Sequence, residues 1–187
     1  MKRKKYIPVE YVDVVDENDT CLAVMPLHEV HRQSLFHRSV MTLAYNAEKK
    51  LFLQKRSRSK QLYPGRWDLS STGHVKAGES RTDAAIRELL EEIGVECDQL
   101  RPIDEVHASV DTAFEFVTLF KSKAITPQQI RLSDEVEDGM FVDRAELACM
   151  VDRFRETLTP AVVHFYMKNK LFADSGTNLH DELDRSS

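Results

Sequence analysis

Residues 73–95 constrain the fold more than any other part of this 187-residue chain. The segment reads GHVKAGESRTDAAIRELLEEIGV, a glycine-containing loop followed by a helical pattern. Glu88, Glu91 and Glu92 stand at positions i, i+3 and i+4, which a helix places on one stripe. Like charges so placed destabilise a helix unless a cation compensates them. Because Mg²⁺ takes oxygen ligands and often completes its shell with substrate phosphates, the segment predicts a divalent-metal site for a phosphorylated substrate.

The same segment carries signals that predict a helix over residues 81–93. Ser80 suits the N-cap, and Gly94 suits the position just after the last helical residue. Apolar residues recur at helical spacing opposite or beside the carboxylates, so we expect a buried face made of Ala85, Ile86, Leu89, Leu90 and Ile93.

Most of the remaining chain has the pattern of short strands. Apolar and β-branched runs bounded by turn residues predict strands at 11–15, 21–25, 39–45, 51–54, 69–75, 103–110, 114–120 and 140–142. Consecutive runs joined by short polar loops are expected to form antiparallel hairpins, including 39–45 with 51–54. Residues 27–36 have a weak helical pattern, and helices are predicted at 144–154 and from Pro160, with Thr159 as its cap, to about residue 171. This order predicts an α/β fold with a mixed sheet covered on both faces.

Composition excludes several classes of protein. With 42% hydrophobic and 30% charged residues, the chain suits one soluble domain. A net charge of -5 argues against DNA as a partner. The sequence has no apolar run of about 18 residues, no signal-peptide pattern and no CxxC motif among its three cysteines. We therefore expect a cytoplasmic protein with no membrane partner, and a homodimer is compatible with the sequence.

The spacing within residues 73–95 resembles the signature of the Nudix hydrolases at every position. The matching residues are Gly73, Glu79, Arg87, Glu88, Glu91, Glu92, Gly94 and the aliphatic residues between and after them. Members of that family use a divalent metal to cleave a diphosphate linkage. The resemblance implies a Nudix-type α/β/α sandwich with a mixed β-sheet and an N-terminal β-hairpin extension. We expect a single domain over 1–187, with an extension at 1–38, a core at 39–172 and an unstructured tail at 174–187.

The resemblance also implies roles for residues of the motif. Glu88, Glu91 and Glu92 would bind Mg²⁺ or Mn²⁺, and the Gly73 carbonyl would add a ligand. Arg87 would pair with Glu79 and hold the loop against the helix. The plainer alternative is that the glutamates form a solvated helix face, and the match of the whole motif argues against it.

Catalytic roles are predicted for Glu88, Glu92 and Glu135. One of them, Glu88 or Glu135, would accept the proton of the attacking water. Glu135 belongs to the acidic turn Asp134–Glu137, for which a merely solvated turn is the alternative.

Four residues outside the motif are further candidates. Glu115 alternates with Phe114 and Phe116 and is either a metal ligand or a solvent-facing strand residue. Arg56 and Lys60, in the basic run 55–60, suit diphosphate oxygens, or they belong to a solvated loop. Trp67 would stack on a ring of the substrate, or it is a packing anchor.

A second resemblance links residues 11–67 to the Nudix branch related to isopentenyl-diphosphate isomerase. It rests on Val14–Asn18, His37-Arg38, Gln54–Lys60, Pro64-Gly65 and Trp67. His37, His74 and Glu115 match positions of the isomerase site.

The departures from the isomerase pattern argue against its chemistry. Thr72 occupies the place of the catalytic cysteine, Ala113 replaces one strand glutamate, and Val30, with His31 one residue away, stands at another histidine position. We predict His74 to bind substrate, with a structural role as the alternative for it and for His37. The expected function is divalent-metal-dependent hydrolysis of a small-molecule diphosphate, such as a nucleoside diphosphate. The alternatives are an isomerase-like enzyme and a non-catalytic nucleotide-binding module.

Overall fold

The computed structural model describes residues 9–172, and the predicted tail at 174–187 lies outside the described residues. The strands are β1 (Tyr11–Val15), β2 (Cys21–Pro26), β3 (His37–Leu43), β4 (Leu51–Arg56), β5 (Trp67–Asp68), β6 (Ser71–His74), β7 (Arg101–Val106), β8 (Glu115–Lys121) and β9 (Val136–Val142). The helices are α1 (Leu27–Gln33), α2 (Arg81–Ile93), α3 (Arg144–Arg153) and α4 (Pro160–Met167). Short 3₁₀ turns cover Val110–Thr112, Pro127–Gln129 and Arg155–Thr157.

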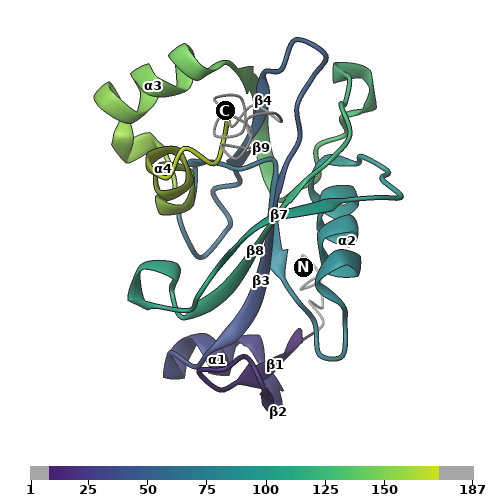
Figure 1. The fold of residues 1–187 in the computed structure, drawn as a ribbon, viewed down its shortest axis with the longest axis vertical. Coiled ribbons are helices and arrows are strands. Elements are labelled where there is room, and N and C mark those ends of the chain that lie inside the picture. The colour runs from purple at the N-terminus through teal and green to yellow at the C-terminus, as the bar shows by residue number, and fades with distance from the viewer. Residues whose placement is uncertain (1–8, 173–187) are drawn as a thin grey trace, which may run out of the picture.

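A four-stranded mixed sheet forms the centre of the molecule. Its strand order is β6-β3-β8-β7, with β3 parallel to β8 and the other pairs antiparallel. A second, antiparallel sheet has the order β5-β4-β9. Helix α2 lies on one side of these strands, and α3 and α4 lie on the other (Figure 1). This is the predicted α/β/α arrangement.

Two apolar cores fill the spaces between the layers. The core beneath α2 contains Ala85, Leu89 and Ile93 of the helix, packed on Val40 of β3 and Phe120 of β8. The other core joins the opposite face of the strands to α3 and α4 and includes Leu43, Leu119, Leu147, Val151, Val162 and Phe165. Successive residues of a strand point to opposite faces, so β3 and β8 supply both cores.

The predicted hairpin of residues 39–45 with 51–54 is wrong. Strands β3 and β4 belong to different sheets. The two segments meet at their ends, through an isolated antiparallel bridge from Tyr45 to Leu51 and a hydrogen bond from the Phe52 amide to the Ala44 carbonyl over 2.8 Å. Strand β3 pairs with β6 and β8, whereas β4 pairs with β5 and β9. The hairpins expected from the other consecutive runs, 11–15 with 21–25 and 103–110 with 114–120, are present as β1 with β2 and β7 with β8.

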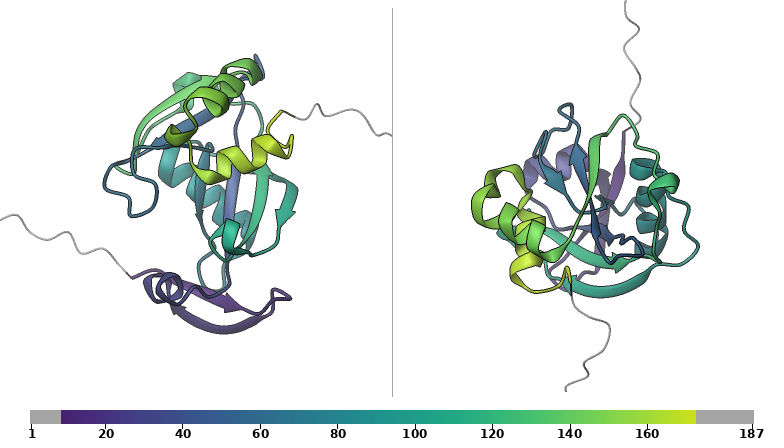
Figure 2. Two further views of the ribbon diagram at one scale, coloured as in Figure 1. Left: turned by 90° about the vertical axis from the view of Figure 1, so that its left-hand side faces the viewer. Right: turned by 90° about the horizontal axis from the view of Figure 1, so that it is seen from above.

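The N-terminal hairpin lies at one end of the molecule and contacts the loop of the motif (Figure 2). The Ala77 amide donates to the Tyr11 carbonyl over 2.8 Å, and Val12 forms a bridge with Lys76. Arg38 of β3 donates to Asp19 in the β1–β2 turn over 2.6 Å, and Arg81 at the start of α2 also donates to Asp19. Main-chain and ionic contacts thus join this hairpin to the core. In the described part of the chain, no helix has the length and apolarity needed to cross a membrane.

Candidate metal and diphosphate site

Helix α2 begins and ends at the predicted residues. The Ser80 hydroxyl accepts from the Asp83 amide, and Gly94 adopts a left-handed conformation with φ of 69°. Ala85 and Leu89 are buried as predicted, but Leu90, which we expected on the buried face, is 47% exposed. Leu90 therefore lies toward solvent.

Glu88, Glu91 and Glu92, which we call the glutamate ridge, differ in burial. Glu92 is 1% exposed and Glu88 is 9% exposed, while Glu91 lies at the surface. Burial raises the pKa of Glu88, although the Arg87 guanidinium acts in the opposite direction. The ridge is thus two partly or wholly desolvated carboxylates with a third that remains in water.

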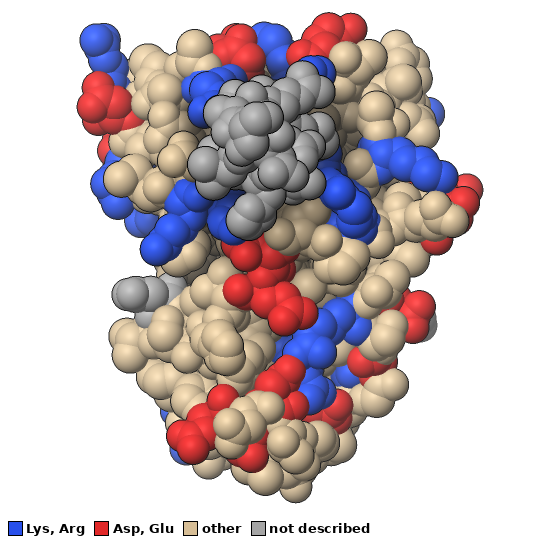
Figure 3. Space-filling view, in the orientation of Figure 1, with Lys and Arg blue, Asp and Glu red and all other residues tan. Residues whose placement is uncertain are grey.

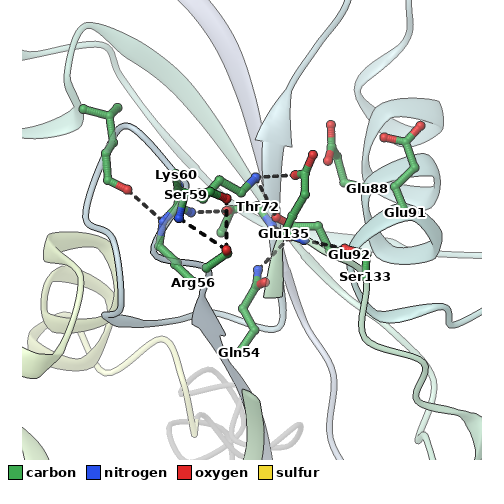
Figure 4. A network of polar contacts seen from close by, with 12 residues as sticks. Gln54, Arg56, Ser59, Lys60, Thr72, Glu88, Glu91, Glu92, Ser133 and Glu135 are labelled. Carbon is green, nitrogen blue, oxygen red and sulfur yellow. Dashed lines mark hydrogen bonds and ion pairs between the residues drawn. The ribbon is translucent and has the colours of Figure 1, made fainter. Parts of the chain in front are cut away.

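Glu92 has the most extensive set of protein partners of the three. Its Oε2 accepts from the Thr72 amide over 2.8 Å and from Gln54 Nε2 over 2.7 Å, while its Oε1 lies 3.7 Å from Lys60 Nζ (Figure 4). Burial raises the pKa of Glu92 to about 7, against the opposite effect of Lys60 and the Thr72 amide. The neutral and ionised forms of this carboxyl therefore both exist near neutral pH.

Arg87 connects the motif loop to the ridge. Its guanidinium donates twice to Glu79, each over 2.8 Å, and once to the His74 carbonyl over 3.0 Å. It also donates to Glu88 and, over 3.2 Å, to Glu91. The structure brings together the predicted pair of Arg87 and Glu79. Arg87 also neutralises Glu88 and Glu91.

Gly73 is required by the close approach of Glu88. A Cβ atom at this position would overlap the Glu88 carboxylate and its neighbouring methylene. Only glycine therefore allows the β6 backbone to lie against this side chain. The predicted role of the Gly73 carbonyl as a ligand stays a prediction, and its position beside Glu88 is consistent with it.

Arg56 and Lys60 lie beside the ridge, and Asp68 holds Arg56 in place. Arg56 Nη1 donates to Asp68 Oδ2 over 3.0 Å and to Thr72 Oγ1 over 3.3 Å (Figure 4). Asp68 is buried, and its Oδ1 accepts from the Thr159 hydroxyl over 2.7 Å. Sequence reasoning missed Asp68, because a lone aspartate near a turn has no distinguishing pattern.

Lys60 pairs with Glu135 across the site. The Lys60 ammonium donates to Glu135 Oε2, and the Ser57 amide donates to the Glu135 carbonyl over 2.9 Å. The basic run and the acidic turn are therefore neighbours, although about 75 residues separate them. Glu135 is exposed and paired, which is compatible with both the catalytic role and the solvated turn considered from the sequence.

A second group of potential ligands lies next to the ridge. The ligand atoms of His31, His37, His74 and Glu115, which we call the histidine cluster, all lie within 4.8 Å of one another. Glu115 Oε1 is 3.7 Å from His37 Nε2 and 3.5 Å from His74 Nε2. Glu115, predicted as a metal ligand from the sequence, thus lies among imidazoles.

The alignment with the isomerase branch placed Val30 at one histidine position, and the structure corrects this. Val30 is fully buried in the small core under the N-terminal hairpin, whereas His31 lies in the histidine cluster with ring centroids 5.1 Å from His37 and 5.0 Å from His74. The weak helical pattern of residues 27–36 gave no means of deciding which residue faces inward.

The electrostatics of the histidine cluster suit a metal. Burial and the neighbouring His74 and His37 lower the pKa of His31 to about 4, so its imidazole is neutral at pH 7. Burial alone would raise the pKa of Glu115, but His37 and His74 outweigh it and hold that pKa well below its usual range. Within the described residues, the Nε2 atoms of His31 and His37 are buried without a hydrogen-bond partner. Burial lowers the pKa of His74, but its interaction with Glu115 outweighs burial and raises that pKa, so a metal would have to displace a proton there. Once deprotonated, imidazole nitrogens together with a carboxylate form a donor set for a transition metal.

A cavity of about 260 Å³ joins these groups. Its polar lining residues include Arg56, Lys60, Thr72, Gly73, His74, Glu88, Glu91, Glu115 and Glu135, and its apolar lining residues include Met41, Val106, Val117, Pro160, Ala161 and Phe165. Acidic and basic surfaces lie side by side in the middle of the face shown in Figure 3. The cavity can thus receive a polyanion beside an apolar group.

Trp67 differs from the other predicted substrate-binding residues. It packs against the core that contains Leu69 and Leu158, and Lys55 Nζ lies 6.0 Å from its ring centroid. It is not among the residues that line the cavity. The structure therefore favours the packing anchor over a stacking platform.

The family of the chain follows from this fold and motif together with a family comparison. Residues 35–164 match the model of the NUDIX domain. The chain therefore belongs to the Nudix family and is a Nudix hydrolase.

Two kinds of relative are similar in sequence. A Nudix hydrolase of Pseudomonas aeruginosa is 33% identical over 139 residues, covering 74% of this chain and 81% of the relative. An isopentenyl-diphosphate Delta-isomerase of Pectobacterium atrosepticum is 35% identical over 91 residues, covering 49% of this chain and 51% of the relative.

Solved structures show the same fold. The crystal structure of a Deinococcus radiodurans protein superposes with a TM-score of 0.72 at 22% identity, covering 85% of this chain and 98% of that one. The crystal structure of a MutT protein from Methanosarcina mazei superposes with a TM-score of 0.57 at 25% identity, covering 70% of this chain and 89% of that one.

Proposed function

We propose that this Nudix hydrolase cleaves the diphosphate linkage of a nucleoside diphosphate or a related small molecule, with Mg²⁺ or Mn²⁺ as its cofactor. The observation that carries the proposal is the cavity in which carboxylates and cationic side chains meet. Glu88 and Glu91 line it on one side, and Arg56 and Lys60 line it beside them. A diphosphate needs both kinds of group, because its oxygens pair with guanidinium and ammonium groups and its metal pairs with carboxylates.

The residues present fit a hard divalent cation. Glu88, Glu91 and Glu92 would supply oxygen donors, and the carbonyl of Gly73, which lies on β6 against Glu88, would add another. When bound, such a cation stabilises negative charge on phosphoryl oxygens and lowers the pKa of a bound water. In the structure, Arg87 and Lys60 contact the same carboxylates, so loading of the ridge requires these contacts to rearrange.

The chain itself supplies binding and proton transfer. Arg56, held by Asp68, would bind a phosphoryl oxygen near Thr72. Glu88 or Glu135 would accept the proton from the attacking water. Burial raises the pKa of Glu88, which favours its acting as a proton acceptor.

The histidine cluster supports a second candidate function, an isomerase-like reaction on an isoprenoid diphosphate. The similarity to a protein named isopentenyl-diphosphate Delta-isomerase favours it as well. Thr72 argues against it, because a hydroxyl at the place of the isomerase thiol is a much weaker acid. A cytoplasmic location, a small-molecule substrate without DNA as a partner, and a homodimer belong to the same proposal as predictions from the sequence.

One experiment tests the proposal and separates the candidates. The protein is incubated with Mg²⁺ or Mn²⁺ and with nucleoside diphosphates, dinucleotides, sugar nucleotides and isopentenyl diphosphate. Phosphate-containing products and double-bond migration are then measured. We expect hydrolysis that EDTA abolishes, and a fall of at least about 100-fold in the Glu92→Gln variant, since the metal-binding charge is lost. Migration without hydrolysis would favour the isomerase, and full activity of Glu92→Gln would contradict the assignment of the site.

A further inference from the structure

Lys60 contacts the carboxylate oxygen of Glu92 that Thr72 and Gln54 do not bind. Its Nζ is 3.7 Å from Glu92 Oε1, and the other carboxylate oxygen is already occupied by the Thr72 amide and Gln54 (Figure 4). Lys60 lines the cavity and Glu92 does not, so the ammonium lies on the cavity side of the carboxylate. The oxygen of Glu92 that remains for a cation therefore faces a protein cation.

Lys60 is better suited to leave the ridge than Arg87 is. Arg87 makes three further hydrogen bonds, two to Glu79 and one to the His74 carbonyl. Moving Arg87 away from the ridge would break these hydrogen bonds, which hold the motif loop. Apart from Glu92, Lys60 has the exposed Glu135 as its ionic partner. A lysine side chain also rotates freely about its methylenes, and its ammonium has no fixed bonding plane.

We propose that Lys60 is a competing counter-ion, whose ammonium neutralises Glu92 in the metal-free protein and must move away before a divalent cation binds that carboxylate. Glu135 is the partner that retains Lys60 when it leaves Glu92. This inference rests on the proposed function, because it assumes that Glu92 is a metal ligand. The affinity of the site for metal then depends on Lys60 as well as on the metal ligands.

The test measures metal binding without substrate, by calorimetric titration with Mg²⁺ at pH 8.5. Mg²⁺ prefers oxygen ligands, so it reports on the glutamate ridge and not on the imidazoles. This pH lies above the Glu92 pKa of about 7, so the carboxyl of the wild type is mostly ionised. We expect Lys60→Met to bind Mg²⁺ roughly three- to tenfold more tightly than the wild type, because the substitution removes the positive charge of Lys60 from beside the bound Mg²⁺.

Matched variants separate this contact from net charge. Lys55→Met removes the same charge from the same segment, but Lys55 pairs with Glu137 at 3.3 Å, so we expect a change of less than about twofold. Lys60→Arg keeps the charge and should bind Mg²⁺ like the wild type. In the Glu92→Gln background, Lys60→Met should give no gain, because the shared carboxylate is absent.

The outcomes distinguish the inference from the proposed function. If Lys60→Met binds Mg²⁺ no more tightly than Lys55→Met, the inference is overturned and the proposed function stands. If the gain persists in the Glu92→Gln background, the competition is not at Glu92 and the inference is also overturned. If the wild type binds neither Mg²⁺ nor Mn²⁺ in the same titration, both are wrong.

Discussion

Two cations of the chain neutralise the three carboxylates of the glutamate ridge. Glu92 has Lys60, whereas Glu88 and Glu91 share Arg87. From the sequence, the repulsion of three like charges indicated an external cation, yet the structure shows that protein cations compensate them. The metal prediction therefore rests on the donor set and on the family, and the repulsion argument alone does not require a metal.

Gly73 gives a prediction at the scale of single residues. Gly73→Ala should displace the Glu88 side chain and lower Mg²⁺ affinity at least about tenfold, because the added methyl overlaps the carboxylate. Gly78→Ala is the control. Its φ of 75° makes alanine cost about 1 kcal/mol, but nothing lies within 4 Å of the new Cβ, so Mg²⁺ affinity should persist. Calorimetric titration measures the Mg²⁺ affinity, and thermal unfolding measures the stability. Undiminished Mg²⁺ affinity in Gly73→Ala would show that the close packing of Gly73 against Glu88 is not needed for metal binding.

The elements show which signals in the sequence decide structure. Helix α2 was predicted with correct limits because its cap, its stop and its periodicity are all local. The pairing of β3 with β4 was predicted wrongly because short runs with a turn between them fit many partners. Long-range burial assigned these strands to two sheets. The histidine cluster also depends on long-range packing, because α1, β3, β6 and β8 each supply one of its four residues.

Asp68 of β5 gives a prediction at the scale of elements, because it joins Arg56 of β4 to the Thr159 cap of α4. Asp68→Asn should lower the free energy of unfolding by about 2–4 kcal/mol, since the largely buried Arg56 loses its anionic partner. Asp98→Asn is the control, because Asp98 and its partner Lys123 are both exposed, and its effect should be much smaller than that of Asp68→Asn. Urea unfolding measures both, and equal effects would show that Asp68 does not act as this connection.

At the scale of the whole molecule, the N-terminal hairpin and α1 form a cap on the end of the central sheet that carries the site. The main ionic link is Asp19, which accepts from Arg38 and from Arg81. Because α1 brings His31 to the site, the hairpin and the histidine cluster depend on the same attachment. The described part of the extension predicted at 1–38, residues 9–38, thus contributes to the site, and the limits of the extension stay a prediction.

Asp19→Asn tests this attachment. Asp19 has a φ of 63°, a conformation that asparagine tolerates well, so the substitution removes the charge without straining the turn. We expect faster hydrogen exchange in β1, β2 and α1 with unchanged exchange in α2, since the ionic contacts of Asp19 with Arg38 and Arg81 are weakened. Glu17→Gln, at an exposed position of the same turn, should leave the exchange pattern unaltered. If β1, β2 and α1 exchanged equally slowly in both variants, Asp19 would not be needed to attach the N-terminal hairpin to the core.

The contact between the motif loop and β1 consists of main-chain atoms, through the Ala77 amide and the Tyr11 carbonyl. Such a contact is indifferent to side-chain identity except where proline removes the donor. The outer surface of the hairpin is therefore free to change in evolution while the loop keeps its position. Diversity among related enzymes can accumulate at this end of the molecule without disturbing the chemistry beside it.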